Sequence, residues 1–186
     1  SVMLQKAKER YGDDLSITWK YFSLEQVNST QGPEWKVWEQ GEDFPSRGLW
    51  SFRAAEAARK QGDEKFEAFH VSLLAARHKD RKDIGKLEVL EEIATESGLD
   101  LEQFRKDIMN PDSKAAVGRD HTEAVEEYGV FGTPTIFPGN DRGFYLKLMP
   151  APEGDKALET FENVYRTISE FPDIQELKQP RKPRRE

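Results

Sequence analysis

The chain has 186 residues, enough for one ordinary domain, and its 28 basic and 35 acidic residues give a formal net charge of −7. An acidic chain offers no general basic field for nucleic acid, and no segment approaches the run of about 18 apolar residues that a membrane span needs. The sequence contains no cysteine. Disulfides, thiolate zinc sites, iron–sulfur clusters and a cysteine nucleophile are therefore excluded within these residues.

The first part of the chain predicts a helix and then a strand. Apolar residues recur at helical spacing over residues 2–11, and Gly12 is a suitable stop. From Leu15 to Phe22 apolar side chains alternate with polar ones, which is typical of a half-buried strand. Residues 23–45 lose this periodicity among glycines and prolines. A connection of that length is usually functional or contains a short helix.

Helical periodicity dominates the middle of the chain. Ser46 is a suitable N-cap, and Asp100 with Gln103 resembles a capping box. Gly129 fits the position that follows a helix. The predicted helices cover residues 47–61, 66–77, 87–98, 101–110 and 113–128.

Two extended runs, Thr135–Pro138 and Phe144–Leu148, follow these helices. The five residues that join them begin and end with glycine, which predicts a hairpin. A last helix is predicted over residues 154–170, and residues 179–186, rich in proline, arginine and lysine, predict a disordered basic tail. This order of elements favours one α/β domain interrupted by a helical insertion.

The segment Gly129–Phe137 is the most informative part of the sequence. A helix ends at its first residue, and a strand begins directly after Pro134, which cannot donate to a strand ladder. The order helix, Gly-Val-Phe-Gly-Thr-Pro-Thr, strand resembles the cis-proline loop of the thioredoxin superfamily. The resemblance implies a cis Thr133–Pro134 bond, whereas most X–Pro bonds are trans.

The resemblance covers nearly all of residues 1–170. Trp19–Glu25 is similar to the second strand of DsbA-like proteins and the loop after it, and three further segments are similar to their helical insertion. These segments are Arg53–Arg59, Phe66–Arg77 and Ser97–Asp100. The pattern resembles the branch that contains FrnE-type proteins and 2-hydroxychromene-2-carboxylate isomerases.

The family implies an α/β thioredoxin-like fold with an inserted α-helical domain. The thioredoxin-like domain is then expected to be discontinuous, formed by residues 1–45 and 113–178, with the helical insertion at 46–112. The family also implies a first strand that leads into Cys-Pro-x-Cys, or a variant with one Cys or a Ser, at the N-terminus of the first helix. The helix dipole and its free N–H groups stabilise a thiolate there.

That motif belongs immediately before Ser1, so the natural polypeptide is expected to be longer by one strand and a tight loop, unless another chain supplies the strand. No catalytic nucleophile is expected within residues 1–186. By the resemblance, Thr133 and Pro134, with Phe131 and Gly132 beside them, would bind the substrate through its backbone or its sulfur.

Three functions are compatible with this resemblance. The first is thiol–disulfide exchange, or reduction that uses a low-molecular-weight thiol of the glutathione or mycothiol type. The second is a kappa-transferase-like, thiol-dependent isomerase, and the third is a non-catalytic thioredoxin-like binding module. The residue that opens the first helix distinguishes them. The expected partner is a thiol or disulfide substrate, protein or small molecule, with no bound cofactor, no nucleic acid and no membrane. The expected protein is a cytoplasmic monomer or homodimer.

Other candidate residues have structural alternatives. Trp35 and Trp38 could line a pocket for an apolar group, or they could pack the long connection against the domain. His121 lies on the apolar face of the helix that leads to the proline loop, where a catalytic role competes with that of a hydrogen-bonded, partly buried imidazole. His70 and His78 share a helix face with no carboxylate at metal-ligand spacing, so no metal site is predicted.

Overall fold

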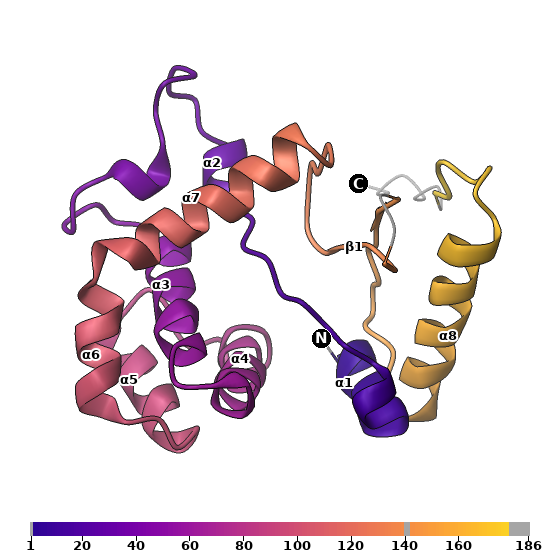
Figure 1. Ribbon diagram of the computed structural model, residues 1–186, viewed down its shortest axis with the longest axis horizontal. Coiled ribbons are helices and arrows are strands. Elements are labelled where there is room, and N and C mark those ends of the chain that lie inside the picture. The colour runs from indigo at the N-terminus through magenta and orange to yellow at the C-terminus, as the bar shows by residue number, and fades with distance from the viewer. Residues whose placement is uncertain (1, 140–141, 179–186) are drawn as a thin grey trace, which may run out of the picture. The chain divides into compact units, whose positions relative to one another are not determined.

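The computed structural model describes residues 2–139 and 142–178 and is mostly helical (Figure 1). Eight α-helices, two 3₁₀ turns and two short strands lie in the described residues. The helices are α1 Val2–Tyr11, α2 Leu24–Val27, α3 Arg47–Arg59, α4 Asp63–His78, α5 Leu87–Glu96, α6 Leu101–Met109, α7 Pro111–Glu126 and α8 Asp155–Glu170. The 3₁₀ turns are η1 Gly12–Asp14 and η2 Val37–Glu39, and the strands are β1 Thr135–Ile136 and β2 Phe144–Tyr145.

The long helices confirm the sequence predictions, with ends that differ by a few residues. The side chain of Asp100 accepts the predicted bond from the Gln103 N–H at 2.9 Å. The reciprocal bond of the capping box comes from the turn between α3 and α4, because the Asp100 N–H donates to Gln61 Oε1 at 2.8 Å. At α7 the helix starts earlier than predicted, since Asn110 caps it and Pro111 occupies its first turn.

The chain forms two compact units, each with its own small core. The first unit runs from Ile17 to Thr133, and the second combines Val2–Ser16 with the chain from Pro134 onward. The predicted division at residues 45/46 and 112/113 remains a prediction, and the compact units divide the chain elsewhere. Residues 17–45 and 113–133 join the helical unit because their apolar side chains pack on its helices. The predicted tail at 179–186 lies outside the described residues.

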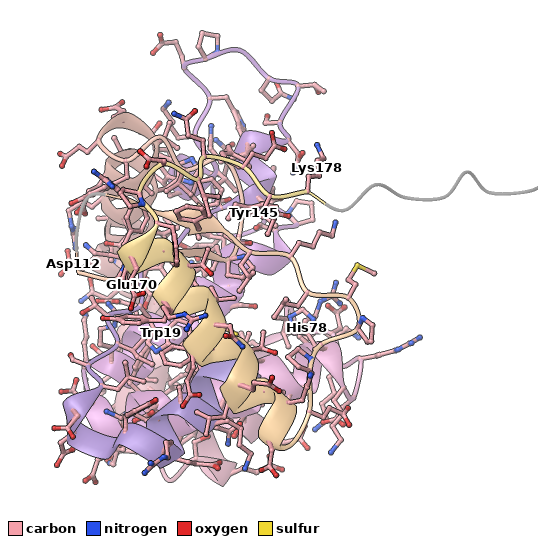
Figure 2. All side chains as sticks on the ribbon, turned by 90° about the vertical axis from the view of Figure 1, so that its right-hand side faces the viewer. Trp19, His78, Asp112, Tyr145, Glu170 and Lys178 are labelled. Carbon is pink, nitrogen blue, oxygen red and sulfur yellow. The ribbon has the colours of Figure 1, made fainter. Side chains whose placement is uncertain are left out.

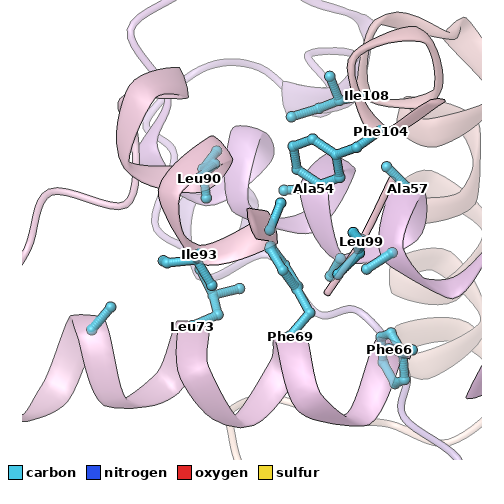
Figure 3. Packing of buried hydrophobic residues seen from close by; sticks show 14 of the residues in the cluster. Ala54, Ala57, Phe66, Phe69, Leu73, Leu90, Ile93, Leu99, Phe104 and Ile108 are labelled. Carbon is cyan, nitrogen blue, oxygen red and sulfur yellow. The ribbon is translucent and has the colours of Figure 1, made fainter. Parts of the chain in front are cut away.

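The core of the first unit surrounds α3, which packs against α4, α6 and α7. Three alanines of α3 are fully buried, which lets the neighbouring helices approach closely: Ala54, Ala57 and Ala58. Figure 3 shows Phe69 of α4 pointing into this core, where its ring lies 5.8 Å from that of Phe104, measured between centroids. Aromatic and aliphatic side chains from five helices, α3 to α7, thus close a single apolar interior.

The predicted strand Leu15–Phe22 is extended but has no strand partner in the part of the chain that the structure describes. Its burial keeps the period of two, since the odd-numbered residues from 15 to 19 are half-buried and the even-numbered ones from 16 to 20 are exposed. Among the described residues, residues 16–22 make no backbone–backbone hydrogen bond. Side chains partly compensate, because Asp120 accepts from the Tyr21 N–H at 3.0 Å and Arg59 donates to the Trp19 carbonyl at 3.0 Å. The alternation therefore predicts the extended, half-buried conformation correctly, and the described residues provide no ladder for this segment.

The second unit packs α1 against α8 and the hairpin. Met3, Ala7 and Phe161 are its buried centre, and apolar residues of the hairpin segment pack on them. Strands β1 and β2 are antiparallel with Thr135 opposite Tyr145, which confirms the predicted hairpin in a shorter form. Tyr145 is labelled on the hairpin in Figure 2. None of the helices in the described residues is both long enough and apolar enough to cross a bilayer.

Candidate functional site

A cleft of about 660 Å³ opens in the first unit beside the start of α2. This volume falls within the range of about 300–1,000 Å³ that small-molecule sites occupy. Thr133 lines the cleft together with most of the segment 20–25 and with residues at the start of α3. The lining residues are Lys20, Phe22, Ser23, Leu24, Glu25, Pro45, Gly48, Phe52 and Thr133. Two segments singled out in the sequence, Trp19–Glu25 and the proline loop, therefore meet here.

Helix α7 holds the 21–23 backbone in place. Asp120 accepts from the Tyr21 N–H, and His121 Nδ1 accepts from the Ser23 N–H at 3.1 Å. Ser23 then begins α2, since its hydroxyl accepts from the Gln26 N–H at 3.1 Å. The side chains of α7 thus supply hydrogen bonds to the extended segment that leads into α2.

His121 lies behind the cleft wall rather than in it. It is buried, and its ring centroid lies 4.8 Å from that of Phe22 and 5.2 Å from that of Trp38. Burial lowers the pKa of His121, and the positive charge of Lys36 lowers it further. The neutral ring accepts at Nδ1 and therefore carries its proton on Nε2. In this position the imidazole orients the Ser23 backbone.

The two tryptophans of the long connection do not line this cleft. Trp38 packs on Gly118 of α7, where a Cβ would lie only 2.7 Å from the indole Nε1, so glycine is needed for the close approach. Trp38 also lines a second cleft of about 860 Å³ along α7. Trp35 packs against Phe44, with ring centroids 5.9 Å apart. The structure therefore separates the predicted pocket residues from Thr133.

The proline loop has the predicted strand start but not the predicted peptide bond. Strand β1 begins at Thr135, directly after Pro134, and the Pro134 carbonyl accepts from the Leu146 N–H at 2.9 Å. Among the described residues the cis peptide bond is Met149–Pro150, and Thr133–Pro134 is trans. The trans form is intrinsically favoured by about 0.5–1 kcal/mol. Thr133 and Pro134 are exposed, so packing does not override that preference, whereas Gly132 beside them is buried and Phe131 is exposed.

The wall formed by Pro45 is fixed by a buried arginine. Arg53 of α3 donates through Nε to the Ile108 carbonyl at 2.8 Å and to the Ser113 hydroxyl at 3.1 Å. Its Nη1 pairs with Glu42, three residues before Pro45. The exposed connection is thereby tied to the interior of the helical unit.

The cleft holds two charged side chains in different environments. Lys20 Nζ contacts Glu123 at 2.9 Å and Asp120 at 3.3 Å, and the hydrogen bond to Glu123 is the main cause that raises the Lys20 pKa. Glu25 accepts a hydrogen bond from the Ser46 hydroxyl. No cationic side chain pairs with Glu25 among the residues whose side chains are described. Sequence reasoning placed Glu25 after the strand but gave it no role, because its neighbour Ser46 is distant in the chain.

The groups that face the cleft can bind and orient a ligand. The lining residues include Thr133, Glu25 and Phe52, whose side chains carry a hydroxyl, a carboxylate and an aromatic ring. In the described part of the chain, no three His, Asp or Glu side chains are grouped as metal ligands.

Comparison with known protein families gives one match over most of the chain. A family model described as a DSBA-like thioredoxin domain matches residues 1–166. The match includes residues of both compact units and ends within α8.

Proposed function

The chain belongs to the DSBA-like thioredoxin domain family, and from this we propose that it is the substrate-binding part of a thiol–disulfide oxidoreductase. The observation that carries the proposal is the cleft in which Thr133, the residue before the loop proline, meets the 20–25 segment. In this function the cleft binds the part of a disulfide that flanks the reacting sulfurs. The full fold is then a thioredoxin-like domain with an inserted helical domain, of the FrnE and 2-hydroxychromene-2-carboxylate isomerase branch.

The nucleophile in this proposal is a cysteine ahead of Ser1. Among the described residues the 16–22 segment makes no backbone–backbone hydrogen bond, which supports a further strand, because a peptide group that lacks a partner on burial costs about 1–3 kcal/mol. In the family that strand would lead into a cysteine motif at a helix N-terminus, where the helix dipole lowers a thiol pKa. The thiolate would attack one sulfur of a disulfide, forming a mixed disulfide and releasing the other sulfur as a thiolate. A second cysteine of the motif, or a low-molecular-weight thiol of glutathione or mycothiol type, would then resolve the mixed disulfide.

The alternative functions follow from the same site with a different first residue of the helix. A kappa-transferase-like isomerase would need one Cys or a Ser there, together with a thiol cosubstrate. A non-catalytic binding module would need neither, and the absence of cysteine from the 186 residues favours this alternative if they act alone.

The gene sequence upstream of Ser1 and an assay of the encoded polypeptide test the proposal. We expect Cys-Pro-x-Cys, together with reduction of a protein or small-molecule disulfide. A lone Cys or a Ser without disulfide reduction would support the isomerase, and neither residue would support the binding module.

A variant pair tests the cleft in the active polypeptide. Thr133→Val should raise KM for the disulfide several-fold, whereas Thr122→Val, which alters the second cleft along α7, should leave KM unchanged. Equal kinetics for both variants would argue against a substrate-binding role for Thr133.

A further inference from the structure

We propose that the Thr133 cleft recognises a primary ammonium group of its substrate, held between the carboxylate of Glu25 and the ring of Phe52. This inference rests on the proposed function, because it names the substrate class for that same cleft. The shared chemistry is a disulfide that carries an ammonium group near its sulfurs. The ammonium could belong to a small aminoalkyl disulfide or to a lysine side chain of a peptide.

Gly48 places the carboxylate and the ring beside the same point. A Cβ built on Gly48 would lie 3.8 Å from Glu25 Oε2 and 3.8 Å from Phe52 Cε2. Since Gly48 lines the cleft and has no side chain, a ligand can approach its backbone with the carboxylate and the ring on either side. A carboxylate next to an aromatic ring attracts a cation through both its charge and the ring quadrupole.

The charge around the cleft also favours a cation. Lys20 is the cationic side chain among the lining residues, and two carboxylates, those of Asp120 and Glu123, already contact its ammonium group. Glu25 has no such counter-charge among the side chains that the structure describes. This arrangement disfavours an anionic ligand, whereas an ammonium group would pair with the Glu25 carboxylate.

The hydrogen bonding of Glu25 favours an ammonium over a guanidinium group. Its Oε2 already accepts from the Ser46 hydroxyl at the start of α3. A guanidinium binds best when both carboxylate oxygens are free to accept in parallel. An ammonium is a compact point charge and needs only the remaining acceptor sites.

The cysteine-free chain allows a binding test without disulfide exchange. Cystamine and hydroxyethyl disulfide have the same chain length and differ in ending with ammonium or hydroxyl groups. We would titrate each into the 186-residue chain and follow the amide NMR signals of Gly48 and Thr133. We expect cystamine to bind about three- to tenfold more tightly, as a partly exposed ion pair with a cation–π contact allows. The preference should shrink as ionic strength rises.

Two variants and a peptide pair complete the test. Glu25→Gln should remove the preference for cystamine, and Glu39→Gln, a change in the second cleft, should leave it intact. An unchanged amide spectrum outside the cleft would show that Glu25→Gln is folded. A disulfide-linked peptide with lysine, compared with its norleucine analogue, identifies the source of the ammonium. A Glu25-dependent preference restricted to the peptide pair would support recognition of a lysine side chain.

The negative outcomes separate the two proposals. Equal affinity for both small disulfides and for both peptides, with signals that shift at Thr133, would overturn ammonium recognition and leave the disulfide site standing. If none of these disulfides shifts the signals of the cleft, both the ammonium site and the proposed function of the cleft are wrong.

Discussion

Replacement of His121 tests how helix α7 supports the cleft. His121 Nδ1 accepts from the buried Ser23 N–H, and its ring packs against the rings of Phe22 and Trp38. Phenylalanine keeps an aromatic ring but cannot accept a hydrogen bond. Asparagine keeps an acceptor, because its Oδ1 lies close to the position of the histidine Nδ1, but it loses the ring. The two variants therefore separate the hydrogen bond from the packing.

The expected cost of His121→Phe at neutral pH is about 1–3 kcal/mol, the penalty for a buried donor without a partner. The difference in free energy of unfolding between His121→Phe and the unsubstituted chain should become smaller at low pH. Burial lowers the His121 pKa below its ordinary value of 6.5, so the unfolded state binds the proton more readily as pH falls. The stabilising contribution of the neutral imidazole is present above pH 6.5 and is lost as pH falls below it.

Urea unfolding followed by tryptophan fluorescence and circular dichroism at several pH values would measure these changes. The hydrogen-exchange rate of the Ser23 amide reports on this bond locally. Exchange should be slow in the unsubstituted chain and in His121→Asn, and fast in His121→Phe. If His121→Phe is as stable as the unsubstituted chain at pH 7 and keeps its pH dependence, the Ser23–His121 hydrogen bond does not support the cleft.

Three further substitutions test the helical unit by the same unfolding measurement. Burial lowers the pKa of His70 from 6.5 to about 4, so its neutral form should contribute about 3 kcal/mol at pH 7 that is lost between pH 6.5 and 4. His70→Phe should flatten this part of the stability profile, and an unchanged profile would contradict a buried neutral imidazole at this position. Phe69→Ala should cost about 3–5 kcal/mol, because the side chain is fully buried, and a loss below 1 kcal/mol would contradict the core assignment. Asp100→Ala should cost about 1 kcal/mol through loss of the cap on Gln103, and an unchanged urea midpoint would show that this bond is not stabilising.

The helices were determined largely by local sequence. Helix hydrogen bonds join residues four apart, so the cap at Asp100 and the stop at Gly129, whose φ is +63°, can be read from neighbouring residues. The hairpin was predictable for a similar reason, since only five residues separate its two predicted runs. The same proximity does not reveal which distant elements pack together.

The candidate site was predicted in part. The proline loop and the 19–25 segment were identified from the sequence, and the structure brings Thr133 and residues 20–25 into one cleft. The place of Glu25 in the cleft could not be predicted from the sequence. Its partner Ser46 and the neighbouring Gly48 are separated from it along the chain by a long irregular connection. Trp38 and His121, given as possible pocket residues, pack against each other, and Trp38 lines the second cleft along α7.

Strand pairing and the proline bond were decided by tertiary structure. The alternation from Leu15 to Phe22 determines which side chains are buried, but a ladder needs a second strand, and the described residues place none beside this segment. The Thr133–Pro134 isomer depends on contacts that outweigh the intrinsic preference for trans, and an exposed loop lacks them. The absence of cysteine, fixed by the sequence alone, means that residues 1–186 can shape a thiol-chemistry site but cannot supply its thiolate.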